Sequence, residues 1–415
     1  MSIVVMKFGG SSVADADKIR AAASRAIKTK KAGHNVVMVV SAMGDTTDNL
    51  VALADEVNRG KPAPKREMDQ LLVTGEQVTI SLMAMALEEM GQPAISFTAG
   101  QIGMITDDRH TKARLHTIDE KIIKRELAKG RIVIVAGFQG VTPSGDVTTL
   151  GRGGSNVTLV AVAAALKADV CENFTDVDGI YTADPRKVPN ARKIDYISYD
   201  EMLELASLGA NVLHNRAVEF AKKYNVPIHV RNSQNNNKGT MIVAETPSME
   251  RIVVSGAALK DKLARISLRH VPNIPGQAAG IFHTLASNDI VVDDIIQTIG
   301  ENTATVSFTV DLGDFDDAKI VCDKLAKKLN CQVVYETDIA KVSVVGVGMR
   351  VHTGVAQKMF EALAKAKINI QNITTSEIKI SCLIRRQQGA EALQLVHDAF
   401  NLGKKPQKKV KKTAR

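Results

Sequence analysis

Short apolar runs alternate with stretches of helical periodicity through residues 1 to about 245. The apolar runs are rich in Val and Ile and are predicted to be strands, at Ile3–Val5, Val36–Val40, Ala94–Phe97, Ile132–Ala136, Val170–Phe174 and Ile228–Val230. Helices are predicted at about residues 15–31, 67–90, 111–129, 155–167, 200–206 and 214–224. Continuous apolar strands separated by helices are typical of an α/β fold whose mainly parallel sheet is covered on both faces. Ligands of such sheets bind at the carboxyl ends of the strands.

A polar segment at residues 233–250 is predicted to be loop and linker. An internal repeat follows it with an offset of 78 residues. Its first copy holds Gly276, Phe282, Leu285, Ala286, Ile290, Val292 and Ile295, which align with Gly354, Phe360, Leu363, Ala364, Ile368, Ile370 and Ile373. An offset this long indicates a duplicated small α/β domain. Such a pair serves either as a packing and dimerisation module or as a pair of ligand sensors.

The chain has 415 residues, of which 45% are hydrophobic and 24% charged, as in an ordinary globular protein of two or three domains. Its net charge of +9 falls to +2 without the last twelve residues, so nucleic-acid binding is disfavoured. We expect a disordered basic tail at 401–415 rather than a phosphate-binding one. The start of the chain lacks a signal-peptide pattern and no apolar run is long enough for a membrane span, which predicts a cytoplasmic protein. The four scattered cysteines are expected to be inert core thiols.

The first motif with chemical potential is Lys7-Phe8-Gly9-Gly10-Ser11-Ser12, directly after the first strand. Adjacent glycines allow backbone N–H groups to approach a phosphate closely, and the following helix presents its positive end. Lys7 adds a full charge that bridges transferring phosphates. The segment has no Walker A spacing, and alone it also fits a plain strand-to-helix turn.

Two further motifs point to anions. Three glycines surround Arg152 in Thr149–Asn156, where the guanidinium can reach a carboxylate or a phosphate in a bidentate manner. The segment Phe174–Arg186 follows a strand and is dense in acids, glycine and proline, which suits a nucleotide with its Mg²⁺. An exposed Arg beside a helix cap, and an ordinary Asx-rich turn, are the plainer alternatives.

Polar loops also follow other strands and open one helix. Ser41–Thr47 comes after the second strand, and Glu76 lies near the start of an apolar helix. The histidines His110, His214 and His229 lack metal-ligand spacing, so no metal site built from protein side chains alone is predicted.

Taken in order, the motifs resemble those of the aspartate kinases, members of the amino acid kinase fold family. They are KFGGSSV, SAMGDTTD, TGEQ, GQIGMITDDRHTKAR, GFQG, TTLGRGGS, FTDVDGIYTADPR and HVRNS, followed by two ACT-type repeats with SVVGVGMR and TTSEIKIS. The resemblance covers about residues 3–395. It implies a three-layer αβα kinase domain at 1–245 and two ferredoxin-like βαββαβ ACT domains at 251–337 and 338–400. In this family the strand near 251–258 tends to belong to the second ACT domain.

The resemblance also implies an activity: transfer of the ATP γ-phosphate to the β-carboxylate of L-aspartate, with Mg²⁺. This is the first step of lysine, threonine and methionine biosynthesis, including the diaminopimelate route. Residues matching catalytic positions are Lys7, Arg152 and Asn156. Those matching the aspartate site are Ser41, Thr47, Glu76, Arg152 and Ser155, with Glu76 on the substrate ammonium and Arg152 on a carboxylate. Those matching the ATP site are Lys7, Phe8, Gly9, Gly10, Thr175, Asp176, Tyr181, Thr182, Ala183, Asp184, Pro185 and Arg186.

Feedback by lysine, threonine or both is expected from the ACT repeats. Matching effector positions are Pro275, Gly276, Gln277, Ala278, Asp293 and Gln297 in the first repeat, and Val355, Ala356, Asn369, Ile370, Ser376 and Glu377 in the second. The resemblance further implies a homo-oligomer or pairing with a shorter regulatory subunit.

The chain departs from the family pattern at a few positions. After GRGGS the family usually has Asp, and this chain has Asn156, an amide that cannot hold Mg²⁺ as a carboxylate does. Phe174 stands where Tyr is frequent. In the first repeat, Asn273, Val291 and Thr298 replace commoner residues. Two alternatives therefore stay open: a catalytically weak amino-acid-sensing subunit and another kinase of the same fold.

Overall fold

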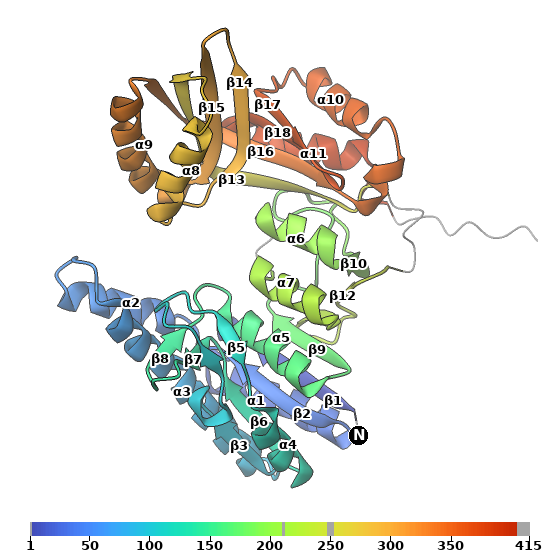
Figure 1. The fold of residues 1–415 in the computed structure, drawn as a ribbon. Helices are drawn as coiled ribbons and strands as arrows, with labels where there is room; N and C mark the ends of the chain where they lie inside the picture. Colours follow the sequence, from blue (N-terminus) through green and yellow to red (C-terminus); the bar gives the residue numbers. More distant parts are fainter. Residues whose placement is uncertain (1, 210–211, 247–252, 405–415) are drawn as a thin grey trace, which may run out of the picture. The chain divides into compact units, whose positions relative to one another are not determined.

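The structure is a computed structural model that describes residues 2–209, 212–246 and 253–404. It consists of two compact units. The N-terminal unit comprises Met1–Tyr181 and Lys193–Met249, and the C-terminal unit comprises Thr182–Arg192 and Glu250–Arg415. The intervening segment Thr182–Arg192 thus leaves the first unit and belongs to the second (Figure 1).

The N-terminal unit is built on an eight-stranded sheet. Its strands, in spatial order, are β10 (Tyr196–Ser198), β12 (Thr240–Val243), β11 (Ile228–Asn232), β9 (Val170–Thr175), β1 (Ile3–Phe8), β2 (Asn35–Val40), β6 (Ile132–Ala136) and β3 (Ala94–Phe97). All neighbouring strands pair in parallel except β11 and β12. The central strand β2 is fully buried from Val36 to Val40, as expected of a strand covered on both faces. The predicted mainly parallel sheet is confirmed.

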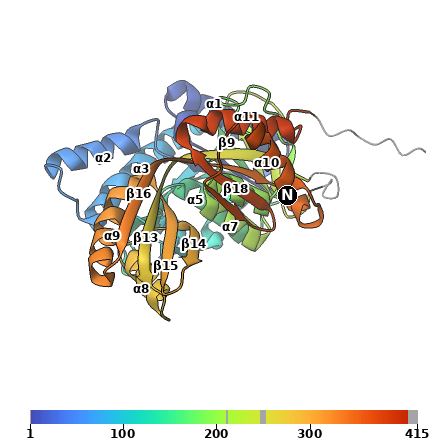
Figure 2. The same cartoon turned by 90° about the horizontal axis from the view of Figure 1, so that it is seen from above.

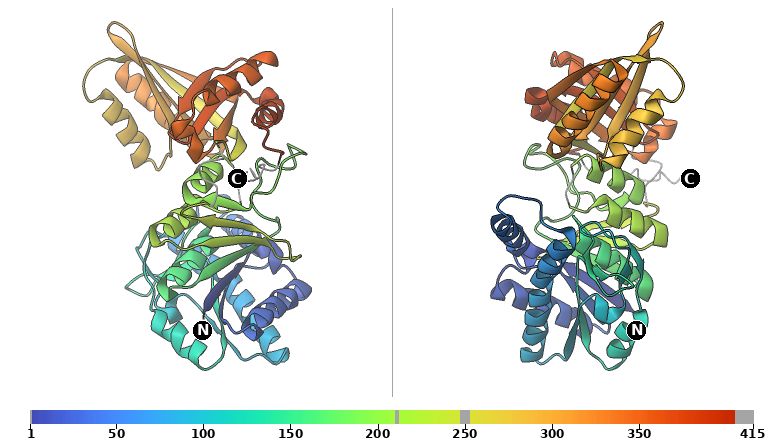
Figure 3. Two further views of the ribbon diagram at one scale, coloured as in Figure 1. Left: turned by 90° about the vertical axis from the view of Figure 1, so that its right-hand side faces the viewer. Right: turned by 60° about the vertical axis from the view of Figure 1, so that its left-hand side comes forward.

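Helices cover both faces of this sheet (Figure 3). The helices of this unit are α1 (Ala16–Lys31), α2 (Thr46–Val57), α3 (Lys65–Glu89), α4 (Glu120–Ala128), α5 (Gly154–Leu166), α6 (Tyr199–Ser207) and α7 (Asn215–Tyr224), of which α2 packs on α3 and not on the sheet. Helices α1 and α3 share one hydrophobic core with the sheet, to which Met6, Met38 and Met83 contribute. Helix α5 packs against β1 and β9 as well as α7. Helix α6 begins with a capping box formed by Ser198 and Glu201.

The predicted helix at 111–129 is wrong in its first half. Residues Leu115–Thr117 form strand β5, and α4 begins only after the N-cap Asp119. Strand β5 belongs to a second sheet of order β5-β4-β7-β8, with β4 at Ile105–Thr106, β7 at Gln139–Val141 and β8 at Val147–Thr149. Helix α3 is long and apolar enough to span a membrane by length and composition alone, whereas no run of that length was predicted. It packs against α1, β3 and β6, which is the position of a core helix.

The C-terminal unit contains one six-stranded antiparallel sheet (Figures 1 and 2). Its strands, in spatial order, are β14 (Asp293–Ile299), β15 (Thr303–Asp311), β13 (Gly256–Pro272), β16 (Gln332–Val345), β18 (Lys379–Arg385) and β17 (Asn372–Thr375). Its helices are α8 (Gln277–Ser287), α9 (Phe315–Leu329), α10 (Val355–Lys365) and α11 (Gly389–Ala399). Two separate cores lie beneath α8 with α9 and beneath α10 with α11. The sheet is therefore a fused pair of similar halves.

The long strands β13 and β16 run through both halves. Residues Gly256–Lys260 of β13 pair with Val345–Lys341 of β16, on the side of the second half. Gly276 and Gly354, aligned in the sequence repeat, both have left-handed backbone with φ of 91° and 85°, directly before α8 and α10. Only glycine adopts this conformation without strain, so the repeat marks equivalent turns in the two halves.

The C-terminal end differs from the expected disordered tail over residues 401–404. These residues form a turn in which the Leu402 N–H donates to the His397 carbonyl. The Leu402 side chain is buried in the core of the second half. Residues 405–415 lie outside the described part, as do 251 and 252 of the predicted strand 251–258, and β13 begins at Gly256.

Candidate active site

The loops after β1 and β2 lie against each other at the carboxyl edge of the sheet. The Ser41 N–H donates to the Phe8 carbonyl at 3.1 Å, and the Gly44 N–H donates to the Gly10 carbonyl at 3.1 Å. A Cβ on Gly10 would lie 2.9 Å from the Ala42 carbonyl oxygen, so only glycine fits there. The predicted phosphate loop and the predicted substrate loop are thus neighbours.

Lys7 is the second-last residue of β1, and its ammonium is turned toward the glycine loop. A Cβ built on Gly9 would lie 3.2 Å from Lys7 Nζ. Burial lowers the pKa of Lys7 to about 8, and the nearby Asp176 carboxylate opposes this in part. Within the described part of the chain, Lys7 makes no ion pair or side-chain hydrogen bond. Lys7 is half-buried, and an ammonium without a protein partner beside a glycine loop is suited to receive an anionic ligand.

Glu76, in helix α3, is 3% exposed and faces the β2 loop. Its Oε1 accepts a hydrogen bond from the Ala42 N–H at 3.1 Å, and its Oε2 has no hydrogen-bond partner among the residues that the structure describes. Burial raises the pKa of Glu76 to about 7, despite the opposing Ala42 hydrogen bond. A buried carboxylate oxygen without a partner is costly, so it marks a place where a cationic group of a ligand would be stabilised.

Ser155 brings the GRGGS segment to the same edge. The Ser41 hydroxyl donates to Ser155 Oγ at 3.0 Å, which joins the β2 loop to the first turn of α5. Asn156 follows in that turn, and its Oδ1 is buried without a hydrogen-bond donor. Thr47 is half-buried in the first turn of α2. The structure therefore gathers Ser41, Glu76 and Ser155 around the backbone of Ala42.

Arg152 is exposed on the loop before α5. The base of this loop is held by Asp69, a fully buried carboxylate of α3. Asp69 accepts hydrogen bonds from Thr149 Oγ1 at 2.5 Å, from the Thr111 N–H at 3.0 Å and from His110 Nδ1 at 2.8 Å. Sequence reasoning missed Asp69, because a single acid near the start of a helix normally indicates an exposed position.

Asn173 is a second residue that sequence reasoning missed. It lies on β9 directly opposite Lys7 in the parallel register, and it is buried with an unpaired Oδ1. An Asn inside an otherwise apolar strand was the available signal. Next along the chain, Thr175 Oγ1 donates to the exposed carboxylate of Asp176 at 3.0 Å.

The predicted ATP segment 181–186 is divided between the two units. Tyr181 belongs to the N-terminal unit, and Thr182–Arg186 belong to the C-terminal unit. Thr182 is fully buried there, 2.9 Å from His397 Nε2, and Ala183 joins the core beneath α10 and α11. Asp184 and Arg186 pair with each other at 2.9 Å, and Pro185 lies exposed between them. The structure thus places the side chains of Thr182 and Ala183 in a core, where they are inaccessible to a ligand.

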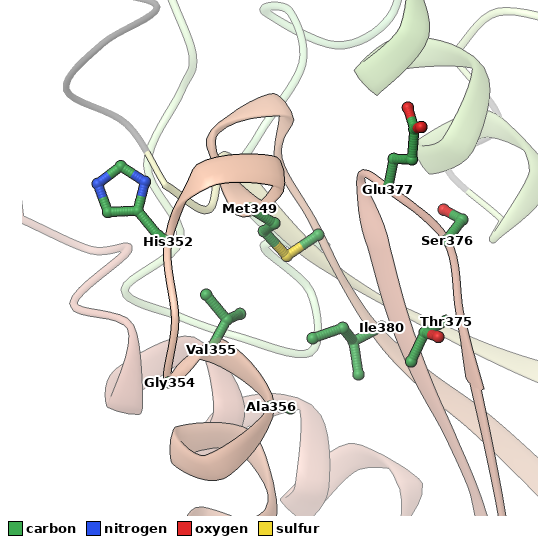
Figure 4. A pocket seen from close by; sticks show the side chains of 9 residues that line it. All are labelled: Met349, His352, Gly354, Val355, Ala356, Thr375, Ser376, Glu377 and Ile380. Atoms are coloured by element: carbon green, nitrogen blue, oxygen red, sulfur yellow. The ribbon is translucent and has the colours of Figure 1, made fainter.

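Part of the predicted effector set lines a cavity of about 500 Å³ in the second half of the C-terminal unit (Figure 4). Val355 and Ala356 contribute the start of α10, and Ser376 and Glu377 contribute the turn between β17 and β18. Met349, His352, Gly354, Thr375 and Ile380 complete the lining. Asn369 and Ile370 are not among the lining residues; Ile370 packs instead against the core.

In the first half, Pro275, Gly276, Gln277 and Ala278 form the turn into α8. Gln297 is exposed on β14, an edge strand. Asp293 already has a protein partner, because its Oδ2 accepts from Lys341 Nζ at 2.6 Å. The predicted positions of the first half are therefore less clearly gathered around one cavity than those of the second.

No group of three or more His, Cys, Asp or Glu side chains is placed to hold a metal ion in residues 2–209, 212–246 and 253–404. Mg²⁺ needs few carboxylates when phosphate oxygens supply other ligands. The exposed carboxylate of Asp176, near Lys7, fits that requirement.

Comparison with known proteins adds independent information. The profile of the amino acid kinase family matches residues 2–232, and that of an ACT domain matches residues 342–400. Aspartokinase 2 of Bacillus subtilis is 49% identical over 407 residues, which cover 98% of this chain and 99% of the relative. Among solved structures, E. coli aspartokinase III in complex with aspartate and ADP has a TM-score of 0.82 at 28% identity, covering 96% of this chain and 99% of that one. The same enzyme in complex with lysine and aspartate has a TM-score of 0.76 at 28% identity, again covering 96% and 99%.

The similarity to the curated relative spans both units, and the structural similarity does as well. The order of strand-end loops and the fused pair of ACT-like halves agree with it. The chain belongs to the aspartate kinase family, as an amino acid kinase domain joined to ACT domains.

Proposed function

We propose that this chain transfers the γ-phosphoryl group of ATP to the β-carboxylate of L-aspartate, at the strand ends where the loops after β1 and β2 meet the start of α5. The observation that carries the proposal is the unpaired buried Oε2 of Glu76, close to Ser41 and Ser155. An α-ammonium group bound there would ionise Glu76 and supply the missing partner. The complex of E. coli aspartokinase III with aspartate and ADP, at 28% identity, supports this choice of substrates.

The chemistry requires little acid–base catalysis. The aspartate side chain has a pKa near ~4 and is already ionised at neutral pH. The difficulty is to bring a carboxylate to a polyphosphate, so catalysis consists of positioning and cationic stabilisation. We assign phosphate contact to Lys7 with the Gly9 and Gly10 backbone, and substrate carboxylate contact to Arg152. Ser41, Thr47 and Ser155 orient the aspartate.

Asp176 would hold Mg²⁺ together with phosphate oxygens, and the ion would neutralise charge on the transferring group. Thr175 and Tyr181 would contact the nucleotide. For Thr182, Ala183, Asp184, Pro185 and Arg186 nucleotide contact stays a prediction from the resemblance, and the side chains of the first two are buried.

We further propose that the cavity at Val355, Ala356, Ser376 and Glu377 binds an effector amino acid. The N-terminus of α10 suits a carboxylate, and Glu377 suits an ammonium. Lysine is the first candidate, because E. coli aspartokinase III is known in complex with lysine, and threonine is the second. Assembly as a homo-oligomer, or with a shorter regulatory subunit, belongs to the same proposal.

A catalytically weak sensing subunit is the second candidate function, favoured by Asn156 in place of the usual Asp. The test is ADP release by the purified full chain with ATP and Mg²⁺, offered L-aspartate, L-glutamate or UMP. The proposal predicts release that depends on aspartate alone and falls when lysine or threonine is added. Release with no aspartate dependence would refute it, and titration with no heat from either amino acid would refute the effector site.

A further inference from the structure

Three asparagine side chains converge on one carboxylate beside the proposed nucleotide site. Asp178 lies in the turn after β9, whereas Asn232, Asn235 and Asn237 lie at the end of β11 and in the following loop. Asp178 Oδ1 accepts from Asn232 Nδ2 at 2.7 Å and from Asn235 Nδ2 at 2.8 Å. Asp178 Oδ2 accepts from Asn237 Nδ2 at 2.8 Å. We call this group the Asp178 clamp.

The side-chain amides of Asn232 and Asn235 are held in one orientation, because the oxygen and the nitrogen of each form hydrogen bonds. Asn232 Oδ1 accepts the Gln234 N–H at 2.8 Å, and Asn235 Oδ1 accepts the Asn237 N–H at 2.9 Å. Each amide thus uses its oxygen on its own loop, which leaves its nitrogen to donate to Asp178. These hydrogen bonds favour the ionised carboxylate and lower the pKa of Asp178. Charge-assisted bonds of this kind are stronger than those between neutral groups.

The clamp connects to the segments assigned to ATP. Asn232 Nδ2 also donates to the Asp176 carbonyl at 3.3 Å, and Asp176 is the carboxylate whose charge reaches Lys7. On the other side, the charge of Asp178 contributes, after burial, to the raised pKa of Tyr181. The clamp therefore spans the turn from Asp176 to Tyr181, and both ends of this turn are proposed nucleotide contacts.

The asparagine loop is itself held against the phosphate loop. Ser12 Oγ donates to Ser233 Oγ at 2.9 Å, and the Ser233 N–H donates to the Thr175 carbonyl at 2.8 Å. Arg25 Nη2 donates to the Asn235 carbonyl at 2.8 Å. A shift of this loop would thus move the end of β9 relative to the glycine loop after β1.

We propose that Asp178, Asn232, Asn235 and Asn237 are positioning residues that hold the Asp176–Tyr181 turn in the conformation that binds ATP. The inference rests on the proposed function and deepens it, since it assigns the affinity for the nucleotide, and not for aspartate, to the loop after β11. The clamp acts on ATP binding through the Asp176–Tyr181 turn alone, so the inference requires no contact between the clamp and the proposed aspartate site.

The test measures KM for ATP and KM for aspartate in the full chain carrying Asn235→Ala, Asn237→Ala or Asp178→Ala. Asn236→Ala is the matched control, because Asn236 is exposed in the same loop and its side chain makes no hydrogen bond within the described residues. We expect KM for ATP to rise about tenfold or more in the clamp variants, as for other small displacements of a binding loop, with KM for aspartate within about twofold of wild type. The rise in melting temperature produced by Mg²⁺ and ADP should shrink in parallel.

A charge exchange distinguishes positioning from general stability. Asn235→Asp alone places two carboxylates together and should weaken ATP binding, whereas Asp178→Asn combined with Asn235→Asp restores one carboxylate among amides and should recover it. Clamp variants that match Asn236→Ala in KM for ATP, or that raise both KM values equally, would overturn the inference while leaving the wild-type activity intact. Wild-type protein without aspartate-dependent ADP release would overturn both this inference and the proposed function.

Discussion

Lys7 in the N-terminal unit and Lys341 in the C-terminal unit are both strand lysines whose side chains are at least partly withdrawn from solvent, yet the surroundings of their ammonium groups are opposite. Lys341 is 1% exposed and lies 2.6 Å from both Asp293 Oδ2 and Asp294 Oδ2. Burial on its own lowers the pKa of Lys341, but the two carboxylates outweigh it and the net shift is upward. For Lys7, burial dominates and the pKa falls to about 8.

The two lysines show how a charge that stabilises the fold differs from a charge that is placed to bind a ligand. The buried charges of the C-terminal sheet neutralise each other, and Thr374 Oγ1 adds a bond to Asp294 Oδ1 at 3.1 Å that links the two halves. At the strand ends of the N-terminal unit, Oε2 of Glu76 is buried and finds no hydrogen-bond partner among the described residues, and the half-buried Lys7 forms no ion pair with them. Unpaired buried charge costs stability, so its presence in a folded protein indicates a ligand site.

Removing Lys341 should have the largest effect on stability. Lys341→Ala leaves Asp294, whose side chain is 5% exposed, as an uncompensated buried charge. We expect a loss of about 3 to 5 kcal/mol in the free energy of unfolding, measured by urea titration. Lys260→Ala is the control, because the Lys260–Asp311 pair has a carboxylate that is 59% exposed and should contribute less than about 1 kcal/mol. Equal losses of unfolding free energy in Lys341→Ala and Lys260→Ala would show that the Lys341 ammonium is not a buried structural charge.

Removing Lys7 should have the largest effect on activity, with no comparable loss of stability. We expect Lys7→Ala to lower kcat at least ~100-fold, the size of one lost transition-state contact. The melting temperature without substrate should stay nearly level, because the side chain forms no ion pair or hydrogen bond with the described residues that the substitution would remove. A loss of kcat under about threefold would exclude Lys7 from its role.

Glu76 predicts a pH dependence of stability in the absence of substrate. Its pKa of about 7 in the folded chain lies above that of the unfolded chain, near ~4.3, so the native state keeps a proton that the unfolded state has lost. Stability therefore falls as pH rises between these values and is level above about 7. From about pH 5.5 to about pH 7.5 the loss amounts to roughly 2 kcal/mol. Glu76→Gln should lack this slope, and a variant with the wild-type slope would contradict the assignment.

Asn156 predicts the smallest change. A carboxylate in the first turn of α5 would interact favourably with the helix dipole and balance nearby cations, a contribution of about 1 kcal/mol. If that charge balance is realised in the transition state, about 1 kcal/mol corresponds to a rise in kcat of about fivefold, which is the result we expect for Asn156→Asp in the ADP-release assay. An unchanged kcat would make the amide a neutral substitution and remove the reason to consider a weakened enzyme.

The sequence predicted the elements that are buried and periodic. Every predicted strand of the N-terminal unit is present, because each is rich in apolar residues and most of those residues are buried in the sheet. Helix α2 was missed, since only Ala54 of its residues is buried and no apolar face marks it. Strand β5 was missed because three residues with mostly exposed side chains carry no periodicity.

For the candidate site, the glycine loops were predictable because close backbone approach has a sequence signature. Asp69 and the Asp178 clamp were not, since they join segments 40 to 80 residues apart by side-chain bonds. The division of the 181–186 segment was equally hidden, because Ala183 and Val188 show no pattern that distinguishes a core position from a loop.

The most direct measurement is the initial rate of ADP release by the wild type and Glu76→Gln, at saturating ATP and Mg²⁺, as L-aspartate is varied. The unpaired carboxylate oxygen predicts that the variant raises KM for aspartate about tenfold or more, the cost of one bond to a charged group, with KM for ATP within about twofold. A Glu76→Gln enzyme with an unchanged KM for aspartate would contradict the account.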